Sequence, residues 1–282
     1  MYEKHFHLQC DPFAVSPDPR FLFSTPAYAE ALAGLAYGIQ SRKGMISLTG
    51  EVGTGKTLAV RCLLRALDPQ SHACCFLFHS QLAADDILRY LLADLGQEPQ
   101  PGPKSALLLQ LSAHLVKLFA QGVTPVLILD EAQNYGPETL EEVRLLTNLE
   151  TAETKLLQVV LVGQPELDAK LDSYGLRQLR QRIMLRLRLA PLGPEQTGLY
   201  IESRLRLAGH ADGRLFTPAA VRLIQQASGG IPRLINVLCA NALLSAFAQG
   251  AQRVEVDAIE EAANDLGLIP QLEFHLTQGG VQ

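Results

Sequence analysis

The chain has 282 residues, of which 48% are hydrophobic and 19% are charged, and its formal net charge is -5. This composition is sufficient for a sizeable buried core and excludes a wholly disordered chain. The acidic balance and the absence of tryptophan argue against a dedicated nucleic-acid-binding protein, although a local basic patch is compatible with both.

The first part of the chain is predicted to alternate between strands and helices. Residues 1–24 contain prolines and phenylalanines without a regular period, which predicts an irregular N-terminal arm. The expected helices are Pro26–Ser41, Lys56–Leu67, Ala84–Leu95, Lys104–Ala120 and Glu138–Leu149. The expected strands are Met45–Thr49, Cys74–Phe78, Val126–Leu129 and Leu156–Val162. Strands that alternate with helices predict a parallel sheet covered by helices.

Ile183–Leu189 has a different pattern from the other strands. Its apolar residues alternate with Met184, Arg186 and Arg188, so that one face is apolar and the other is expected to face solvent. A period of two with one polar face is typical of a strand at the edge of a sheet.

Helices alone are predicted after Pro191. They are expected at Pro194–Ala208, Pro218–Ala227, Pro232–Gln249 and Asp257–Leu266, with Thr217 and Asp257 as N-caps. The expected domains are therefore an arm (1–24), an α/β domain (25–190), a helical subdomain (191–268) and a flexible tail (269–282).

The segment Gly50-Glu51-Val52-Gly53-Thr54-Gly55-Lys56-Thr57 fits the phosphate-binding pattern GxxxxGK[ST]. Glycines let the backbone wrap closely, so that its N–H groups point at phosphate oxygens, and the following helix directs its positive end at the same anion. Lys56 is expected to reach the β and γ phosphates, and the Thr57 hydroxyl to bind Mg²⁺. Leu58 completes the predicted nucleotide-binding stretch. The predicted cofactors are ATP and Mg²⁺.

A buried strand, Val126–Leu129, ends in the two carboxylates of Asp130 and Glu131. Acids at the carboxyl edge of a buried strand are costly unless they have a function there. Asp130 is expected to hold Mg²⁺ through water, and Glu131 to orient and polarise the attacking water. Taken alone, the pair is also compatible with an ordinary loop start.

Four further residues are candidates for the reaction centre. Gln164 follows the strand expected beside the Asp130-Glu131 strand, and it could position the water, although a simple turn residue explains it too. Arg182, or else Arg180, is a candidate for stabilising the transferring phosphoryl group from a neighbouring subunit. Arg233 opens a helix, where its charge is unfavourable unless an anion such as the γ-phosphate lies nearby.

Metal-hydrolase and membrane-spanning patterns are absent from the sequence. The seven histidines include no HExxH pattern, and the five cysteines show neither paired spacing nor a disulfide framework. No apolar run approaches the ~18 residues of a membrane span, and the N-terminus lacks the core of a signal peptide. We therefore expect a cytoplasmic protein, peripheral at the inner membrane only through partners.

These motifs together resemble those of an AAA+ ATPase. The chain is similar to the ExeA/GspA-type secretion ATPases and, more narrowly, to the MSHA-pilus biogenesis ATPases. The resemblance covers nearly the whole chain, and its matching stretches include the Pro12-Phe13 opening, Gly50–Thr57, Leu145–Glu150, Lys155–Leu167 and Gly230–Cys239. It implies a P-loop fold with a five-stranded parallel sheet followed by an all-helical lid. It also implies Walker A and Walker B roles for Gly50–Thr57 and Asp130-Glu131, and sensor roles for Gln164 and Arg233.

The resemblance further implies self-association, with a hexameric ring as one candidate form. It implies pilus or secretion assembly proteins at the inner membrane as partners. ExeA-type chains carry a transmembrane segment and a peptidoglycan-binding domain after the ATPase. This sequence shows neither, which favours the pilus-type reading.

Two other classes of function remain open at this stage. AAA+ regulators of transposition share the same motifs and act on DNA, and Arg186 and Arg188 are compatible with a DNA-backbone patch. A nucleotide-gated scaffold with negligible turnover is the other class, against which the intact Glu131 argues.

Overall fold

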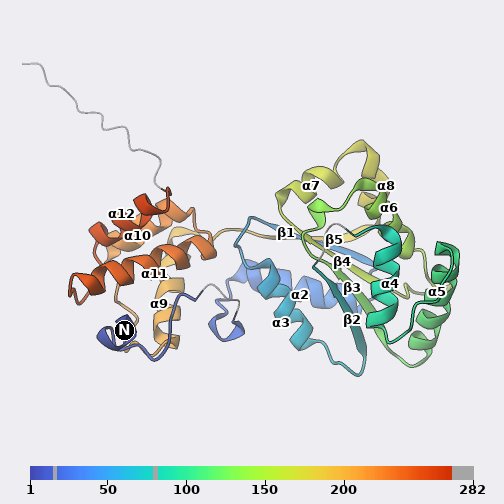
Figure 1. Cartoon of the computed structure of the whole chain (residues 1–282), viewed down its shortest axis with the longest axis horizontal. Helices are drawn as coiled ribbons and strands as arrows, with labels where there is room; N and C mark the ends of the chain where they lie inside the picture. The colour runs from blue at the N-terminus through green and yellow to red at the C-terminus, as the bar shows by residue number, and fades with distance from the viewer. Residues whose placement is uncertain (15–17, 79–81, 269–282) are drawn as a thin grey trace, which may run out of the picture. The chain divides into compact units, whose positions relative to one another are not determined.

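The computed structural model describes residues 1–14, 18–78 and 82–268, and the chain divides into two compact units. One unit spans Pro17–Ala190 and contains the sheet. The other combines Met1–Ser16 with Pro191–Gln282, and its described part is helical. Figure 1 labels the elements of both units. The predicted arm, residues 1–24, is thus divided between the two units, and the predicted tail, residues 269–282, lies outside the described residues.

A five-stranded parallel sheet forms the centre of the first unit, in the order β2-β3-β4-β1-β5. The strands are β1 (Met45–Gly50), β2 (His72–Leu77), β3 (Thr124–Leu129), β4 (Gln158–Gly163) and β5 (Ile183–Leu189). The predicted five-stranded parallel sheet is therefore confirmed. Because β4 lies between β3 and β1, the loops that follow these three strands meet at one edge of the sheet.

β5 lies at the edge of the sheet, as its alternating pattern predicts. Among the described strands it pairs with β1 alone, and residues on one of its faces are exposed while those on the other are half-buried. The half-buried face packs on α2 (Pro26–Gln40), where a Cβ added at Gly34 would lie 2.7 Å from Leu187 Cδ2. Glycine therefore allows the close approach of this helix to the edge strand.

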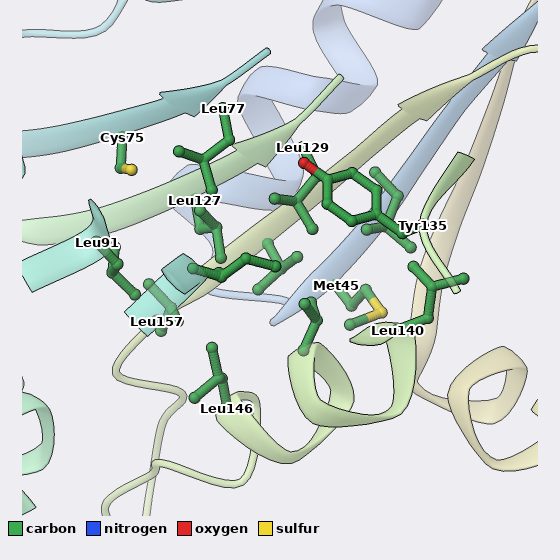
Figure 2. Close-up of a cluster of buried hydrophobic side chains, with 14 of the residues drawn as sticks. Met45, Cys75, Leu77, Leu91, Leu127, Leu129, Tyr135, Leu140, Leu146 and Leu157 are labelled. Carbon is green, nitrogen blue, oxygen red and sulfur yellow. The ribbon is translucent and has the colours of Figure 1, made fainter. Parts of the chain in front are cut away.

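Both faces of the sheet are covered, because successive residues of the central strands enter different apolar clusters. Leu127 and Leu129 of β3 belong to the cluster drawn in Figure 2, which also contains Tyr135. Val126 and Ile128 of the same strand belong to the cluster on the opposite face. This alternation explains why the central strands are apolar at every position, as is typical of buried parallel strands.

Helices from different parts of the chain supply the two covers (Figure 1). One face is packed by α2 and α3 (Lys56–Ala66). The other is packed by α4 (Ala84–Asp94), α5 (Lys104–Ala120), α6 (Pro137–Leu146), α7 (Pro165–Leu171) and α8 (Arg177–Arg182). The described part of this unit also contains the 3₁₀ turns η1 (Pro19–Phe21), η2 (Ala132–Asn134) and η3 (Tyr174–Leu176). The sequence predicted no bounds for α7 and α8, since helices of one or two turns are too short to show a period.

The second unit contains the four helices predicted after Pro191. They are α9 (Pro194–Leu207), α10 (Pro218–Ser228), α11 (Pro232–Ala248) and α12 (Val256–Asp265), joined by the short α1 (Tyr2–His5). Thr217 caps α10, because its side chain accepts a bond from the Ala220 N–H at 3.4 Å. The predicted cap at Asp257 is wrong: the helix begins one residue earlier, and Glu255 is the N-cap.

The N-terminal segment packs into the core of this helical unit. The guanidinium of Arg204, which is 6% exposed, donates to the Pro12 carbonyl oxygen at 2.5 Å and to the Tyr200 hydroxyl at 2.7 Å. The buried ring of Phe13 meets that of Phe216 edge to face, with centroids 5.9 Å apart. Residues 1–14 are therefore a structural part of the unit. Across the described ranges, no helix has both the length and the apolar character needed to cross a membrane.

Candidate nucleotide-binding site

The loop Gly50–Thr57 connects the end of β1 to the first turn of α3. Gly53 and Gly55 have φ values of 85° and 98°, in the left-handed region that favours glycine. At Gly50, an added Cβ would lie only 2.6 Å from the Leu189 carbonyl oxygen. The backbone therefore requires glycine at all three positions, as expected for a loop that turns tightly at the amino end of a helix.

Lys56 lies against the inside of this loop. Its side chain is buried, and its ammonium donates to the carbonyl oxygens of Gly50 at 2.8 Å and Glu51 at 3.0 Å. Burial lowers the pKa of Lys56, and the nearby carboxylates of Glu131 and Asp130 oppose this shift. A desolvated cation at the mouth of a helix is well suited to hold phosphate oxygens.

The other loop residues keep the site accessible. Glu51 and Val52 are exposed, and the exposed fraction of Val52 is 50%. Thr54 stiffens the loop, because its hydroxyl donates to the Glu51 carbonyl oxygen at 2.8 Å. Leu58 is half-buried in the first turn of α3. The loop is thus a surface feature with a fixed backbone, as binding of a polar ligand requires.

Asp130 lies beside Thr57 at the carboxyl edge of the sheet. The Thr57 hydroxyl is 3.4 Å from Asp130 Oδ2, and Asp130 is 6% exposed. Burial raises the pKa of Asp130, while a hydrogen bond from the Glu131 N–H to Oδ1, at 2.9 Å, opposes the shift. A buried carboxylate beside a hydroxyl is an oxygen donor set that suits a hard divalent cation such as Mg²⁺.

Glu131 has a strained backbone and a carboxylate held by two amides. Its φ of 50° and ψ of 42° are left-handed values that cost a non-glycine residue on the order of 1–2 kcal/mol. Glu131 Oε2 accepts from Gln164 Nε2 at 3.1 Å and from Gln133 Nε2 at 2.6 Å. The sequence singled out Gln164 for this neighbourhood but missed Gln133, whose only signal is a polar side chain two residues after an acid.

Helix α7 ties these loops together through contacts that the sequence did not indicate. Thr49 Oγ1 donates to Asp168 Oδ2 at 2.8 Å, which links the end of β1 to α7. The Lys170 ammonium donates to the carbonyl oxygens of Gln133 and Tyr135, each at 2.6 Å. One short helix thus anchors the segment after β3 and the strand that leads into the glycine-rich loop.

The two arginines considered for contact with a neighbouring subunit differ in their surroundings. Arg180 and Arg186 both pair with Asp172, at 3.5 and 3.1 Å. Arg182 is exposed and forms no hydrogen bond or close ion pair within the part of the chain that the structure describes, although its charge contributes to lowering the pKa of Glu150. It lies at a surface hollow that it lines together with Arg144, Arg177, Gln178 and Gln181. This difference favours Arg182 over Arg180 as a group available to an anion.

Arg233 belongs to the helical unit. It is exposed in the first turn of α11, directly after Pro232 at the first helical position. The preceding turn needs glycine, because Gly230 has a φ of 78° and an added Cβ there would lie 2.0 Å from the Leu192 carbonyl oxygen. The suggested contact of Arg233 with the γ-phosphate stays a prediction.

Comparison with known proteins places this site in a defined fold. Residues 39–171 match the family model described as AAA domain. The chain is 43% identical over 268 residues to "General secretion pathway protein A" of Aeromonas hydrophila, a match that covers 94% of this chain and 48% of that protein. The chain therefore spans about half the length of this relative.

Solved structures show the same fold at low identity. The CDC6P protein of Pyrobaculum aerophilum matches with a TM-score of 0.68 and 19% identity, over 92% of this chain and 72% of that one. The Aeropyrum pernix ORC1 protein, solved in complex with DNA, matches with a TM-score of 0.65 and 17% identity, over 91% and 69% of the two chains. Together with the sheet order, these matches establish a P-loop AAA fold with a helical C-terminal region.

Proposed function

We propose, from the premise that this chain carries an AAA domain with the P-loop fold, that it binds and hydrolyses ATP. The observation that carries the proposal is the convergence of three strand ends at one sheet edge. Lys56 and Thr57 follow β1, Asp130 and Glu131 follow β3, and Gln164 follows β4. These are the groups that phosphate binding, cation binding and activation of water need.

Each part of the nucleotide has a matching group in the chain. The backbone of Gly50–Gly55 and the Lys56 ammonium hold the phosphates. Thr57 and Asp130, 3.4 Å apart, would hold Mg²⁺. When bound, the metal supplies neutralisation of phosphate charge. Glu131 accepts a proton from the attacking water, and Gln164 helps to position that water.

Neighbouring copies of the chain complete each site in this proposal. Arg182 is exposed and forms no hydrogen bond or close ion pair within the described ranges, and its guanidinium would stabilise charge on the phosphoryl group held by the next subunit. Arg233 of the helical unit would contact the γ-phosphate. A hexameric ring is one candidate form for this assembly.

The Arg182→Ala variant is expected to lower kcat by about 1,000-fold while ATP affinity stays near that of wild type, because the guanidinium acts on transition-state charge in another subunit. Steady-state kinetics and binding of a non-hydrolysable ATP analogue measure the two effects. Arg222→Ala, which removes an exposed arginine on α10, is the matched control.

Mixing subunits gives a sharper test of action between neighbours. Arg182→Ala and Glu131→Gln subunits are each expected to hydrolyse ATP at least about 100-fold more slowly than wild type when alone. Together they form some interfaces in which an intact Glu131 faces an intact Arg182, so the mixture regains turnover. Wild-type turnover of Arg182→Ala alone would place the arginine finger elsewhere, with Arg180 as the next candidate.

The biological role that we propose is assistance in building an envelope machine at the inner membrane, either a type II secretion apparatus or an MSHA-like type IV pilus. The identity to general secretion pathway protein A supports the secretion part. The pilus part rests on the resemblance of the motifs alone. Partners would bring the chain to the membrane.

A pull-down with the Glu131→Gln variant held on ATP, followed by mass spectrometry, tests this role. If no secretion or pilus component co-purifies with this variant only when ATP is present, the result counts against the role.

Action on DNA is the second candidate, and two observations favour it. The fold resembles that of a protein solved in complex with DNA, and α8 and β5 expose the arginines Arg177, Arg180, Arg182, Arg186 and Arg188. Asp172 pairs with two of these arginines, Arg180 and Arg186, so its one negative charge offsets at most one of their two positive charges. DNA binding whose affinity falls steeply with salt, together with DNA-stimulated hydrolysis, would support this function over envelope assembly.

A further inference from the structure

Gln133 bridges the two loops that carry the predicted catalytic groups. It lies in η2, two residues after Glu131, and its side chain is half-buried. Its Nε2 donates to Glu131 Oε2 at 2.6 Å, and its Oε1 accepts the backbone N–H of Gln164 at 3.1 Å. One side chain therefore ties the segment after β3 to the segment after β4.

The orientation of this amide is fixed by its partners. A backbone N–H can only donate, and an ionised carboxylate can only accept. Reversing the Gln133 amide would place its NH₂ group against the N–H of Gln164 and its oxygen against Glu131. Both contacts would then become repulsive, so a single orientation satisfies the network.

The bridge is held rigidly from outside. Lys170 of α7 donates to the Gln133 carbonyl oxygen, which fixes the backbone that carries this side chain. At Gly163, the last residue of β4, an added Cβ would lie 2.8 Å from Gln133 Oε1. Glycine at this position therefore leaves the space that the Gln133 amide occupies.

Both amides, Gln133 and Gln164, donate to the same oxygen of Glu131, namely Oε2. Two donors occupy the lone pairs of that oxygen and make it a poor proton acceptor. The other oxygen, Oε1, is then the one that accepts a proton from water. If Gln164 turns toward a bound phosphate, Gln133 still holds the carboxylate.

We infer that Gln133 is a positioning residue that orients the Glu131 carboxylate for activation of water. This inference rests on the proposed ATPase function and deepens it. Gln133 touches neither nucleotide nor water in this scheme, and it acts through Glu131. Its loss should therefore affect the chemical step and leave nucleotide binding in place.

The test compares Gln133→Met with wild type. Methionine keeps the length of the side chain and removes both polar groups. We expect kcat to fall about 10- to 100-fold while the Kd for a non-hydrolysable ATP analogue changes less than about 3-fold. Asn134→Ala is the matched control, because Asn134 is the exposed next residue. Its kcat should equal that of wild type.

A second variant, Gln133→Glu, separates the contact with Gln164 from the contact with Glu131. It replaces the methionine variant in the test if that variant does not fold. Glutamate keeps an acceptor for the Gln164 N–H but places a second carboxylate against Glu131. We expect a loss of kcat at least as large as in Gln133→Met. Installed in the Glu131→Gln variant, Gln133→Met should cause no more than about a 2-fold further loss, because its effect passes through the carboxylate.

Three results would overturn the inference. The first is a wild-type kcat for Gln133→Met combined with loss of turnover in Glu131→Gln. This result overturns the role of Gln133 but remains consistent with the proposed ATPase function. Another is a parallel loss of analogue binding and turnover, which indicates a structural role. The third is absence of ATP hydrolysis by the wild-type chain, which overturns the proposed function together with the inference.

Discussion

Replacing Lys56 by alanine is expected to weaken ATP binding about 100-fold, which corresponds to about 3 kcal/mol. The ammonium is buried at the mouth of α3, where it is held by the Gly50 and Glu51 carbonyl oxygens. A phosphate that enters this loop gains charge-assisted bonds from a cation that is already desolvated. Alanine removes these bonds and leaves two carbonyl oxygens without their donor. Titration calorimetry with a non-hydrolysable ATP analogue measures the loss.

Lys117→Ala is the matched control for this experiment. It removes the same charge from an exposed position on α5 and should bind the analogue as wild type does. Thermal unfolding without nucleotide separates loss of fold from loss of binding. Retention of wild-type affinity by a folded Lys56→Ala protein would refute the assignment of the loop.

Replacing Glu131 by glutamine is expected to leave ATP bound but lower kcat by about 100- to 10,000-fold, the range that a general base contributes. Glutamine keeps the size of the side chain, and its amide oxygen can still accept bonds from Gln133 and Gln164. What disappears is the capacity to take a proton from water. Phosphate release under saturating ATP measures turnover, and analogue titration measures binding.

Glu138→Gln makes the same chemical change at an exposed position of α6 and should retain full turnover. If Glu131→Gln hydrolyses ATP at the wild-type rate, its role as the base is wrong. Negligible turnover by the wild-type chain itself would instead favour a nucleotide-gated scaffold.

The sequence by itself determined the elements whose signals are local. Glycine spacing identified the loop Gly50–Thr57, because left-handed backbone values exclude most other residues there. Uninterrupted apolar runs identified the central strands, and the alternation in Ile183–Leu189 identified the edge strand. The proximity of Gln164 to Glu131 was also predicted, because neighbouring parallel strands bring their carboxyl ends to one edge.

Only the tertiary structure decided which side chains meet across those strand ends. The bond from Gln133 to Glu131, the clamp by Lys170 and the pairing of Asp172 with Arg180 depend on backbone directions at the ends of short turns. The packing of Pro12 against Arg204 joins residues from distant parts of the chain. Such contacts leave no periodic pattern in the local sequence. They are set by the order of the strands and by the angle at which each turn leaves the sheet, which follow from packing of the whole unit.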